Sequence, residues 1–424
     1  METSTLATII LVATIILFAT DRYPLAFASL ASVTAMVLTG LLKFSEAFAG
    51  FSSNLIMLVA GMMIIGNALF DNNVVSRIGQ LIFRNFKGGE KAHLLVMMTM
   101  AAVLSGFLHN IAVMAMMLPL AASYVAESNG TMKLKNFYMP LAHATIIGAR
   151  ITLIGASPPM LAQSVLLSSE GVERGLEFFE LAAVAIPVFI VVLLCYNFFL
   201  YRFGNKLFDH NTTNEVNTNI ECSDVPLWKT WVTGIVMIAV ALCFVFIDGV
   251  ELGAISLGGA CVLIFTGCVK WSTAIKKLDW TTLIILGCTN GITSCFTMTN
   301  IDEYVVDLLT RIGGGLSSPF LLVVIFTFVT AWASNVFHNS SASVIFSTLA
   351  VSVALGLGID PIPLVVAVIF GCAFDFIMPT GTSTLTMSCA AGYAFRDYAV
   401  IGSILSPICC ATSALVIALV YQLI

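Results

Sequence analysis

Residues 105–121 read SGFLHNIAVMAMMLPLA, an apolar stretch that is broken in its middle by the polar pair His109-Asn110. Residues 334–350 read SNVFHNSSASVIFSTLA and place a second His-Asn pair inside a stretch of the same kind. In a lipid bilayer such an interruption is tolerated only where protein or a water-filled cavity surrounds it. The two stretches therefore predict where a functional site lies.

The segment that follows each His-Asn pair is interrupted as well. The first break is LIGASPPM, and 48 residues separate His109 from Ser157 within it. The second break is MPTGTS, and 44 residues separate His338 from Thr382. Two corresponding breaks at similar spacing predict an internal repeat.

The composition indicates an integral membrane protein. Of 424 residues, 59% are hydrophobic and 10% are charged, whereas a soluble domain carries about a quarter charged residues. The formal charge of −5 and the lack of a basic run exclude nucleic-acid binding. The eleven cysteines include no C-x-x-C spacing, so we interpret them as small buried hydrophobes rather than a disulfide framework.

The apolar segments divide the chain into two halves of six. A first repeat (1–203) and a second repeat (227–424) flank the hydrophilic linker 204–226, which we expect in the cytoplasm. The candidate spans are 5–20, 24–42, 54–70, 92–126, 138–167 and 178–203, followed by 228–247, 250–269, 280–300, 319–354, 361–391 and 398–421.

Two of these segments are expected to be re-entrant hairpins, 92–126 and 319–354. Each arm of the first has about 16 residues, or about 24 Å of helix, which is short of the hydrocarbon core. Segments 138–167 and 361–391 are expected to be broken helices. Each half then crosses the membrane five times, which predicts an all-α fold of about ten spans plus two hairpins with the two repeats inverted.

The basic residues support this topology. With the N-terminus outside, 14 of the 18 Lys and Arg residues fall in cytoplasmic loops, three fall outside (Lys43, Arg174 and Arg311), and Arg150 lies within the membrane. Such a bias predicts a multi-pass protein of the cell membrane with both termini extracytoplasmic.

If inverted halves face each other, all four breaks meet near the midplane. Helix N-termini there attract an anion, and free carbonyls and hydroxyls can hold a cation. The alternative is that the hydroxyls only bond to their own helices or join neighbouring helices. The candidate polar residues are Ser105, His109, Asn110 and Ser157 in the first half, and Ser334, Asn335, His338, Asn339, Ser340, Ser341, Thr380, Thr382, Ser383 and Thr384 in the second.

Two full charges lie beside the breaks, Arg150 and Asp375. A charge within the membrane is costly and indicates function by default. In one interpretation Arg150 neutralises an anionic substrate while Asp375 binds a coupling cation or proton. In the other, the two residues pair and only fix the packing. His109 and His338 titrate near physiological pH when unperturbed, so proton coupling stays open beside a plain hydrogen-bonding role.

These motifs resemble a known family. SGFLHNIAVMAMMLPLA and SNVFHNSSASVIFSTLA resemble the two S-N-T-A-x-x-A-x-M-L-P hairpin tips of the divalent anion:sodium symporter family, within the ion-transporter superfamily. LIGASPPM and MPTGTS resemble its paired G-T-P-P-N and P-x-x-T-P-P-N loops. The resemblance covers nearly the whole chain.

The resemblance implies an elevator carrier that forms a homodimer and moves dicarboxylates, citrate or sulfate with sodium. Carried over by position, the substrate tips would be Asn110 with Ile111 and Asn339 with Ser340. We also expect Ser157 and Thr382 at the two loops to contact the substrate. The coupling-ion sites would involve His109, Asn110, Ala156 and Ser157, and His338, Asn339, Thr380 and Thr382.

This chain departs from the family pattern at several of these positions. Ile111 replaces a Thr, His109 and His338 replace Ser, and Met160 and Leu385 replace the final Asn of each loop. Arg150 and Asp375 match no family motif. The departures bear on substrate and coupling ion rather than on fold.

We therefore predict a secondary active transporter of a small anion, coupled to sodium or protons. The alternative is a cation/proton antiporter of the same superfamily. An intramembrane enzyme is not expected because neither H-E-x-x-H nor a paired-aspartate motif is present, and we expect no organic cofactor.

Overall fold

The computed structural model describes residues 3–20, 22–74, 77, 89–127, 133–201, 225–247, 249–299, 318–336, 338–379 and 381–423. Every regular element in these ranges is a helix, which confirms the all-α expectation. Most of the expected linker 204–226, and Thr380, lie outside them.

Within these ranges, five helices are long and apolar enough to cross a membrane, and six further apolar helices have 10 to 17 residues. The number of spans therefore stays a prediction. The five long helices cover Asn54–Asp71, Ala182–Leu200, Leu227–Phe244, Asn339–Gly356 and Phe395–Val420.

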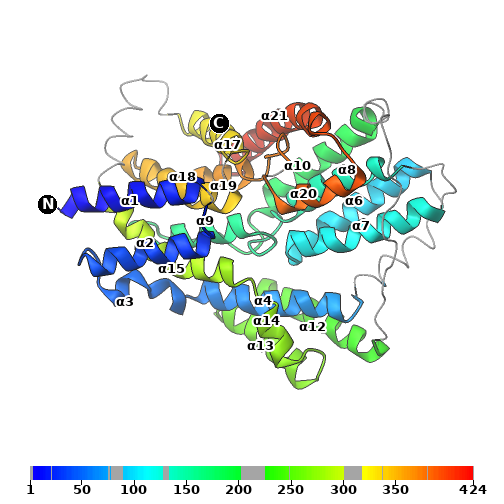
Figure 1. The fold of residues 1–424 in the computed structure, drawn as a ribbon, viewed down its shortest axis with the longest axis horizontal. Helices are drawn as coiled ribbons and strands as arrows, with labels where there is room; N and C mark the ends of the chain where they lie inside the picture. The colour runs from blue at the N-terminus through cyan, green and yellow to red at the C-terminus, as the bar shows by residue number, and fades with distance from the viewer. Residues whose placement is uncertain are drawn as a thin grey trace.

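The helices form two groups that pack mainly among themselves, and α15 makes the largest contact between the groups, against α9 (Figure 1). The first group occupies the left and lower part of the view. It comprises α1 (Thr3–Thr20), α2 (Leu25–Leu38), α3 (Phe44–Ala47), η1 (Ala49–Ser52), α4 (Asn54–Asp71), α12 (Leu227–Phe246), α13 (Leu252–Phe265), α14 (Trp271–Lys276) and α15 (Trp280–Thr297).

The second group contains both His-Asn breaks and both interrupted segments that follow them. It comprises α6 (Glu90–Phe107), α7 (Asn110–Glu127), η2 (Leu134–Asn136), α8 (Tyr138–Gly148), α9 (Ser157–Ser168), α10 (Ala182–Cys195), η3 (Tyr196–Leu200), α17 (Pro319–Ala333), α18 (Asn339–Gly356), α19 (Ile362–Gly371), α20 (Ser383–Ser388), η4 (Cys389–Ala391) and α21 (Phe395–Val420).

Close helix contact within the second group depends on small residues. A Cβ atom added to Gly148 in α8 would lie 2.3 Å from the backbone of Ala102 in α6. Where lipid removes the hydrophobic drive between helices, such close backbone approach supplies the dispersion energy that holds them together. The α6–α8 contact therefore fixes the start of the first break relative to the loop that follows it.

The first break is tied to the loop between α8 and α9. The backbone N–H of Asn110 donates to the carbonyl of Gly155 at 3.1 Å instead of continuing the helix of α6. The hydroxyl of Thr152 donates to the carbonyl of Gly106, which loses its helical partner at the break. These bonds satisfy backbone groups that lipid could not.

The second break is tied to its loop by one side chain, Asn335. Its Nδ2 donates to the carbonyl of Ala331 at 2.7 Å, and its Oδ1 accepts from the N–H groups of Ile377 and Met378 at 3.2 Å each. Asn335 was a candidate ion ligand, but these bonds make it the element that joins α17 to the loop containing Asp375. The neighbouring Ser334 donates to the Ala331 carbonyl as well.

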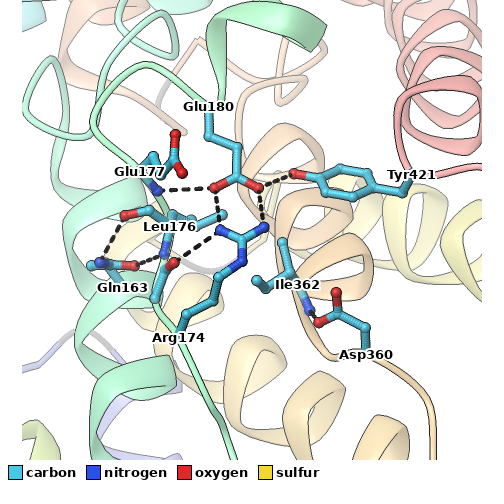
Figure 2. Close-up of polar contacts among 9 residues, drawn as sticks. Gln163, Arg174, Leu176, Glu177, Glu180, Asp360, Ile362 and Tyr421 are labelled. Carbon is cyan, nitrogen blue, oxygen red and sulfur yellow. Dashed lines mark hydrogen bonds and ion pairs between the residues drawn. The ribbon is translucent and has the colours of Figure 1, made fainter. Parts of the chain in front are cut away.

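A polar network closes the loop between α9 and α10 onto the end of α21 (Figure 2). Arg174 donates to both carboxylate oxygens of Glu180 at 2.9 and 3.0 Å, and the hydroxyl of Tyr421 donates to Glu180 at 2.9 Å. Burial raises the pKa of Glu180, but these bonds and one from the Glu177 N–H outweigh it, so that the pKa lies below its ordinary 4.5. The network joins the loop between α9 and α10 to the end of the C-terminal helix α21.

Candidate functional site

A cavity of about 330 Å³ lies where four helices begin, α7, α9, α18 and α20. Its volume falls in the range of small-molecule sites. The four breaks predicted from the sequence therefore converge on one space. The lining consists of Leu25, His109, Asn110, Ile111, Arg150, Ala156, Ser157, Pro158, Asp279, Thr281, Thr282, Ile285, His338, Asn339, Ser340, Gly381, Thr382, Ser383 and Thr384.

The structure brings together most of the residues singled out from the sequence. Both His-Asn pairs, Ile111, Ser340, Arg150, Ala156, Ser157 and Thr382 line the cavity. Asp375 is not part of the lining, and Thr380 lies outside the described residues. The binding roles of these residues stay predictions.

Arg150 is 1% exposed and lies in the turn after α8. Its Nη1 donates to the carbonyl of Ile146 at 3.0 Å, and its Nη2 donates to the carbonyl of Cys372 at 3.3 Å. Among the described residues it forms no ion pair with Asp375. The two charges do act on each other electrostatically without direct contact, so both interpretations of the pair stay predictions, and the guanidinium lines the cavity with no carboxylate bound to it.

Asp375 lies directly behind the cavity wall and is fully buried. Neither carboxylate oxygen has a partner at full hydrogen-bonding distance within the described part of the chain, but the side chains of Asn339 and Thr382 and the charge of Arg150 lie close enough to act on it. A Cβ atom added to Gly381 would lie 2.4 Å from the Oδ2 of Asp375. Because Gly381 lines the cavity and has no side chain, the carboxylate of Asp375 lies next to the cavity. A buried charge without a partner is unstable unless a cation or proton meets it.

Three further oxygen atoms also lack partners among the described residues, namely Asn339 Oδ1 and Thr382 Oγ1, whose side chains neighbour Asp375, and Thr384 Oγ1. All three side chains line the cavity. Carboxylate, amide and hydroxyl oxygens suit a hard cation, while no cluster of His, Cys, Asp and Glu suited to a transition metal occurs in the described ranges. These oxygen atoms are therefore of the kind that bind a hard cation.

The two hairpin tips present different chemistry to the cavity. Asn110 Oδ1 accepts from the N–H of Ile111 at 2.9 Å, which leaves the side-chain NH₂ as the group available to a ligand. His338 Nδ1 accepts from the N–H of Ser340 at 3.4 Å and caps α18. Ile111 is 39% exposed and adds an apolar surface to the cavity.

The sequence interpretation missed the wall contributed by the first helix group. Leu25 at the start of α2 and four residues at the start of α15, Asp279, Thr281, Thr282 and Ile285, complete the cavity. An acidic residue directly before an apolar span is typical of a helix N-cap, and the sequence carried that signal at Asp279. Nothing in the pattern indicated that this cap faces the breaks.

A second cavity of about 370 Å³ shares His109, Ile111 and Asp279 with the first. It lies between α4 and α7 and is lined at one edge by Lys277, which forms an ion pair with Asp71. Both cavities therefore lie at the first His-Asn break, with His109, Ile111 and Asp279 in the two linings.

Comparison with known proteins identifies the family. A family model described as a citrate transporter matches residues 15–371 and, in a second match, residues 244–424. The chain belongs to the citrate transporter family. This confirms membership of the superfamily that the hairpin motifs indicated, and it makes the chain a multi-pass membrane transporter rather than an enzyme.

Relatives of this citrate transporter family member are distant. An uncharacterised transporter of Synechocystis is 25% identical over 45% of this chain and 31% of that longer protein. An uncharacterised transporter of Methanocaldococcus jannaschii is 24% identical over 91% of this chain and 87% of that protein. The sodium-dependent dicarboxylate transporter SdcS of Staphylococcus aureus is 21% identical over 86% of this chain and 75% of that protein.

The fold also matches a solved structure. The YdaH transporter of Alcanivorax borkumensis superposes with a TM-score of 0.64 at 14% sequence identity, over 99% of this chain and 98% of that chain. At this identity the likeness establishes a shared transporter fold for the citrate transporter family member and nothing about substrate.

Proposed function

We propose that this protein is a secondary active transporter of a small anion of the di- and tricarboxylate or sulfate class, coupled to sodium or protons. The observation that carries the proposal is the convergence of four helix starts on one cavity that also contains the buried guanidinium of Arg150. Helix N-termini and a cation without a carboxylate partner together favour an anionic ligand.

The family and the relatives support this substrate class over the cation/proton antiporter. The matching family model describes citrate transport, and a relative aligned over most of the chain is a dicarboxylate transporter. The amide groups of Asn110 and Asn339 at the hairpin tips can donate to carboxylate oxygens. Because Ile111 stands where the resembled motif has Thr, the first tip has one hydroxyl donor fewer. We expect a substrate that forms fewer hydrogen bonds at this tip.

Asp375 is the strongest candidate for the coupling ion. Its buried carboxylate, together with Asn339 and Thr382, supplies oxygen ligands for sodium. Binding of the cation would also lower the cost of bringing a multiply charged anion next to a buried carboxylate. His109 and His338 keep proton coupling open because both line the same cavity.

The proposed mechanism is elevator-type alternating access in an inverted-repeat homodimer of the cell membrane, with both termini extracytoplasmic. The segregation of the breaks into one helix group, with the other group forming a separate wall, supports a transport domain that slides against a scaffold.

Uptake by the purified protein in proteoliposomes tests this function. Labelled citrate, succinate and sulfate are each offered under an inward sodium gradient, an inward proton gradient, or neither. We expect saturable uptake of at least one anion that depends on one of the gradients. Uptake of no anion under either gradient would overturn the proposal, and sodium-driven proton release without any anion would instead support the antiporter.

A further inference from the structure

A directed chain of hydrogen bonds begins at Asp279, the residue before α15. Its Oδ1 accepts from the N–H of Thr282 at 3.3 Å, the usual bond of a helix N-cap. Its Oδ2 accepts from the hydroxyl of Thr282 at 2.5 Å, a second bond that capping does not require. A carboxylate can only accept, so the single hydroxyl hydrogen of Thr282 is committed to Asp279.

The chain continues across the interface between the two helix groups. Ser157, the first residue of α9, has its Oγ 2.9 Å from the Oγ1 of Thr282. Because the hydrogen of Thr282 points to Asp279, Ser157 must be the donor in this contact. Ser157 therefore donates to Thr282 and Thr282 donates to Asp279, and the carboxylate of Asp279 sets this direction because it can only accept.

This direction decides what Ser157 offers to the cavity that it lines. With its hydrogen turned toward Thr282, Ser157 presents only oxygen lone pairs. The next two residues, Pro158 and Pro159, have no N–H, so the start of α9 is also poor in amide donors. An anion needs donors and a cation needs oxygens, so this corner of the cavity suits a cation.

We propose that Asp279 and Thr282 are positioning residues that hold Ser157 as an oxygen ligand of the coupling sodium ion. The inference rests on the proposed function and assigns Ser157, a candidate for either ligand, to the cation. Since α15 belongs to the helix group that carries no break, this contact between the two groups positions Ser157 in the conformation that the structure shows.

A second pair of the same kind provides a matched control. The hydroxyl of Ser168 at the end of α9 has two acceptors within reach, Thr293 Oγ1 of α15 at 3.2 Å and the carbonyl of Val165 in its own helix at 3.1 Å. Both pairs are separated by 125 residues in sequence, so α9 and α15 are joined by the same contact at two levels. Neither Ser168 nor Thr293 lines either of the two cavities described above. Thr293→Val therefore removes a hydroxyl contact between the same two helices and leaves the cavity lining unchanged.

The experiment compares Thr282→Val, Thr282→Ser and Thr293→Val with the wild type. Sodium binding is measured in detergent as the thermal stabilisation by NaCl relative to choline chloride. The sodium concentration for half-maximal citrate uptake is measured in proteoliposomes. We expect Thr282→Val to raise both sodium half-saturation values about fivefold, as for loss of one hydrogen bond. Thr282→Ser and Thr293→Val should stay near wild type, and the citrate KM at saturating sodium should be unchanged in all three.

A fourth variant tests whether Thr282 acts through Ser157. Adding Thr282→Val to Ser157→Ala should cause no further loss of sodium affinity, because the ligand that Thr282 positions is already gone. Equal losses in Thr282→Val and Thr293→Val, additive losses in the double variant, or a wild type that sodium does not stabilise would each overturn the inference. Sodium binding with the expected variant pattern but no anion uptake would overturn the proposed function alone.

Discussion

The Nη2 of Arg150 lies 3.3 Å from the carbonyl oxygen of Cys372, three residues before Asp375. The bond joins the break of the first half to the break of the second. With Nη1 on the carbonyl of Ile146, the guanidinium is held by two neutral acceptors. Its position is fixed while its charge stays available to a ligand in the cavity.

Substitutions at Arg150 separate the contribution of its charge from that of its two hydrogen bonds to backbone carbonyls. Arg150→Met should raise the KM for the transported anion about 10- to 100-fold, the range for loss of a charged hydrogen bond. Arg150→Lys keeps the charge but cannot reach two carbonyls with a fixed fork, so we expect an intermediate KM. Initial rates of uptake in proteoliposomes measure both, with size-exclusion profiles in detergent as the control for folding. Equal KM values for wild type and Arg150→Met would show that the charge does not meet the substrate.

Asp375→Asn should uncouple transport without loss of the fold. The carboxylate is fully buried and has no partner at full hydrogen-bonding distance among the described residues, so the neutral amide removes an electrostatic cost. We expect a melting temperature at or above that of the wild type, together with loss of the dependence of uptake on the coupling gradient. Melting curves in detergent and uptake with and without the gradient give the two readings. A variant that does not fold would mean that Asp375 serves the packing.

Gly381→Ala tests the same carboxylate from the cavity side. The added Cβ would meet Asp375 Oδ2 at 2.4 Å, and the carboxylate is the movable partner in this contact. We expect a folded protein whose half-saturating concentration of coupling ion rises about tenfold, because the oxygen ligand is displaced. Gly358→Ala is an unsuitable control because its φ is positive, whereas Gly258→Ala has open space around the new methyl group. Unchanged ion dependence in Gly381→Ala would separate Asp375 from the coupling site.

The sequence predicted the helical class and the two pairs of breaks because apolar length and polar interruption are local properties. It placed both His-Asn pairs, Ser157 and Thr382 at breaks, and the structure brings these residues to one cavity. It could not show that the Oδ1 of Asn335 accepts hydrogen bonds from the backbone N–H groups of Ile377 and Met378, since these lie 42 and 43 residues away. It also missed Asp279 and Thr282, because only packing of the two helix groups brings α15 to the breaks.

The loop between α9 and α10 should lose stability in acid. The pKa of Glu180 is below its ordinary 4.5 in the folded protein, so the carboxylate stabilises the fold fully above that pH and progressively less as the pH falls below it. Glu180→Gln should lower the melting temperature by about 2 °C or less at pH 7, since Arg174 is half exposed, and flatten the decline below pH 4.5. Melting curves between pH 3.5 and 7 measure this. Glu177→Gln is the control, because only its backbone N–H takes part in the network; an equal effect there would rule out the Arg174–Glu180 pair as the cause.

Ile111→Thr should recover a donor at the first hairpin tip. Ile111 is 39% exposed and lines both cavities, at the position where related motifs carry Thr. A hydroxyl there can donate to a carboxylate oxygen, and one such bond is worth about a three- to tenfold decrease in KM for a dicarboxylate. Ile111→Val has the shape of Thr without the hydroxyl, so it separates hydrogen bonding from the change in volume. Uptake of succinate at saturating coupling ion measures the difference. Equal KM values for Ile111→Thr and Ile111→Val would mean that a hydroxyl at this tip does not donate to the substrate. Residue 111 would then contact the substrate only through its apolar surface.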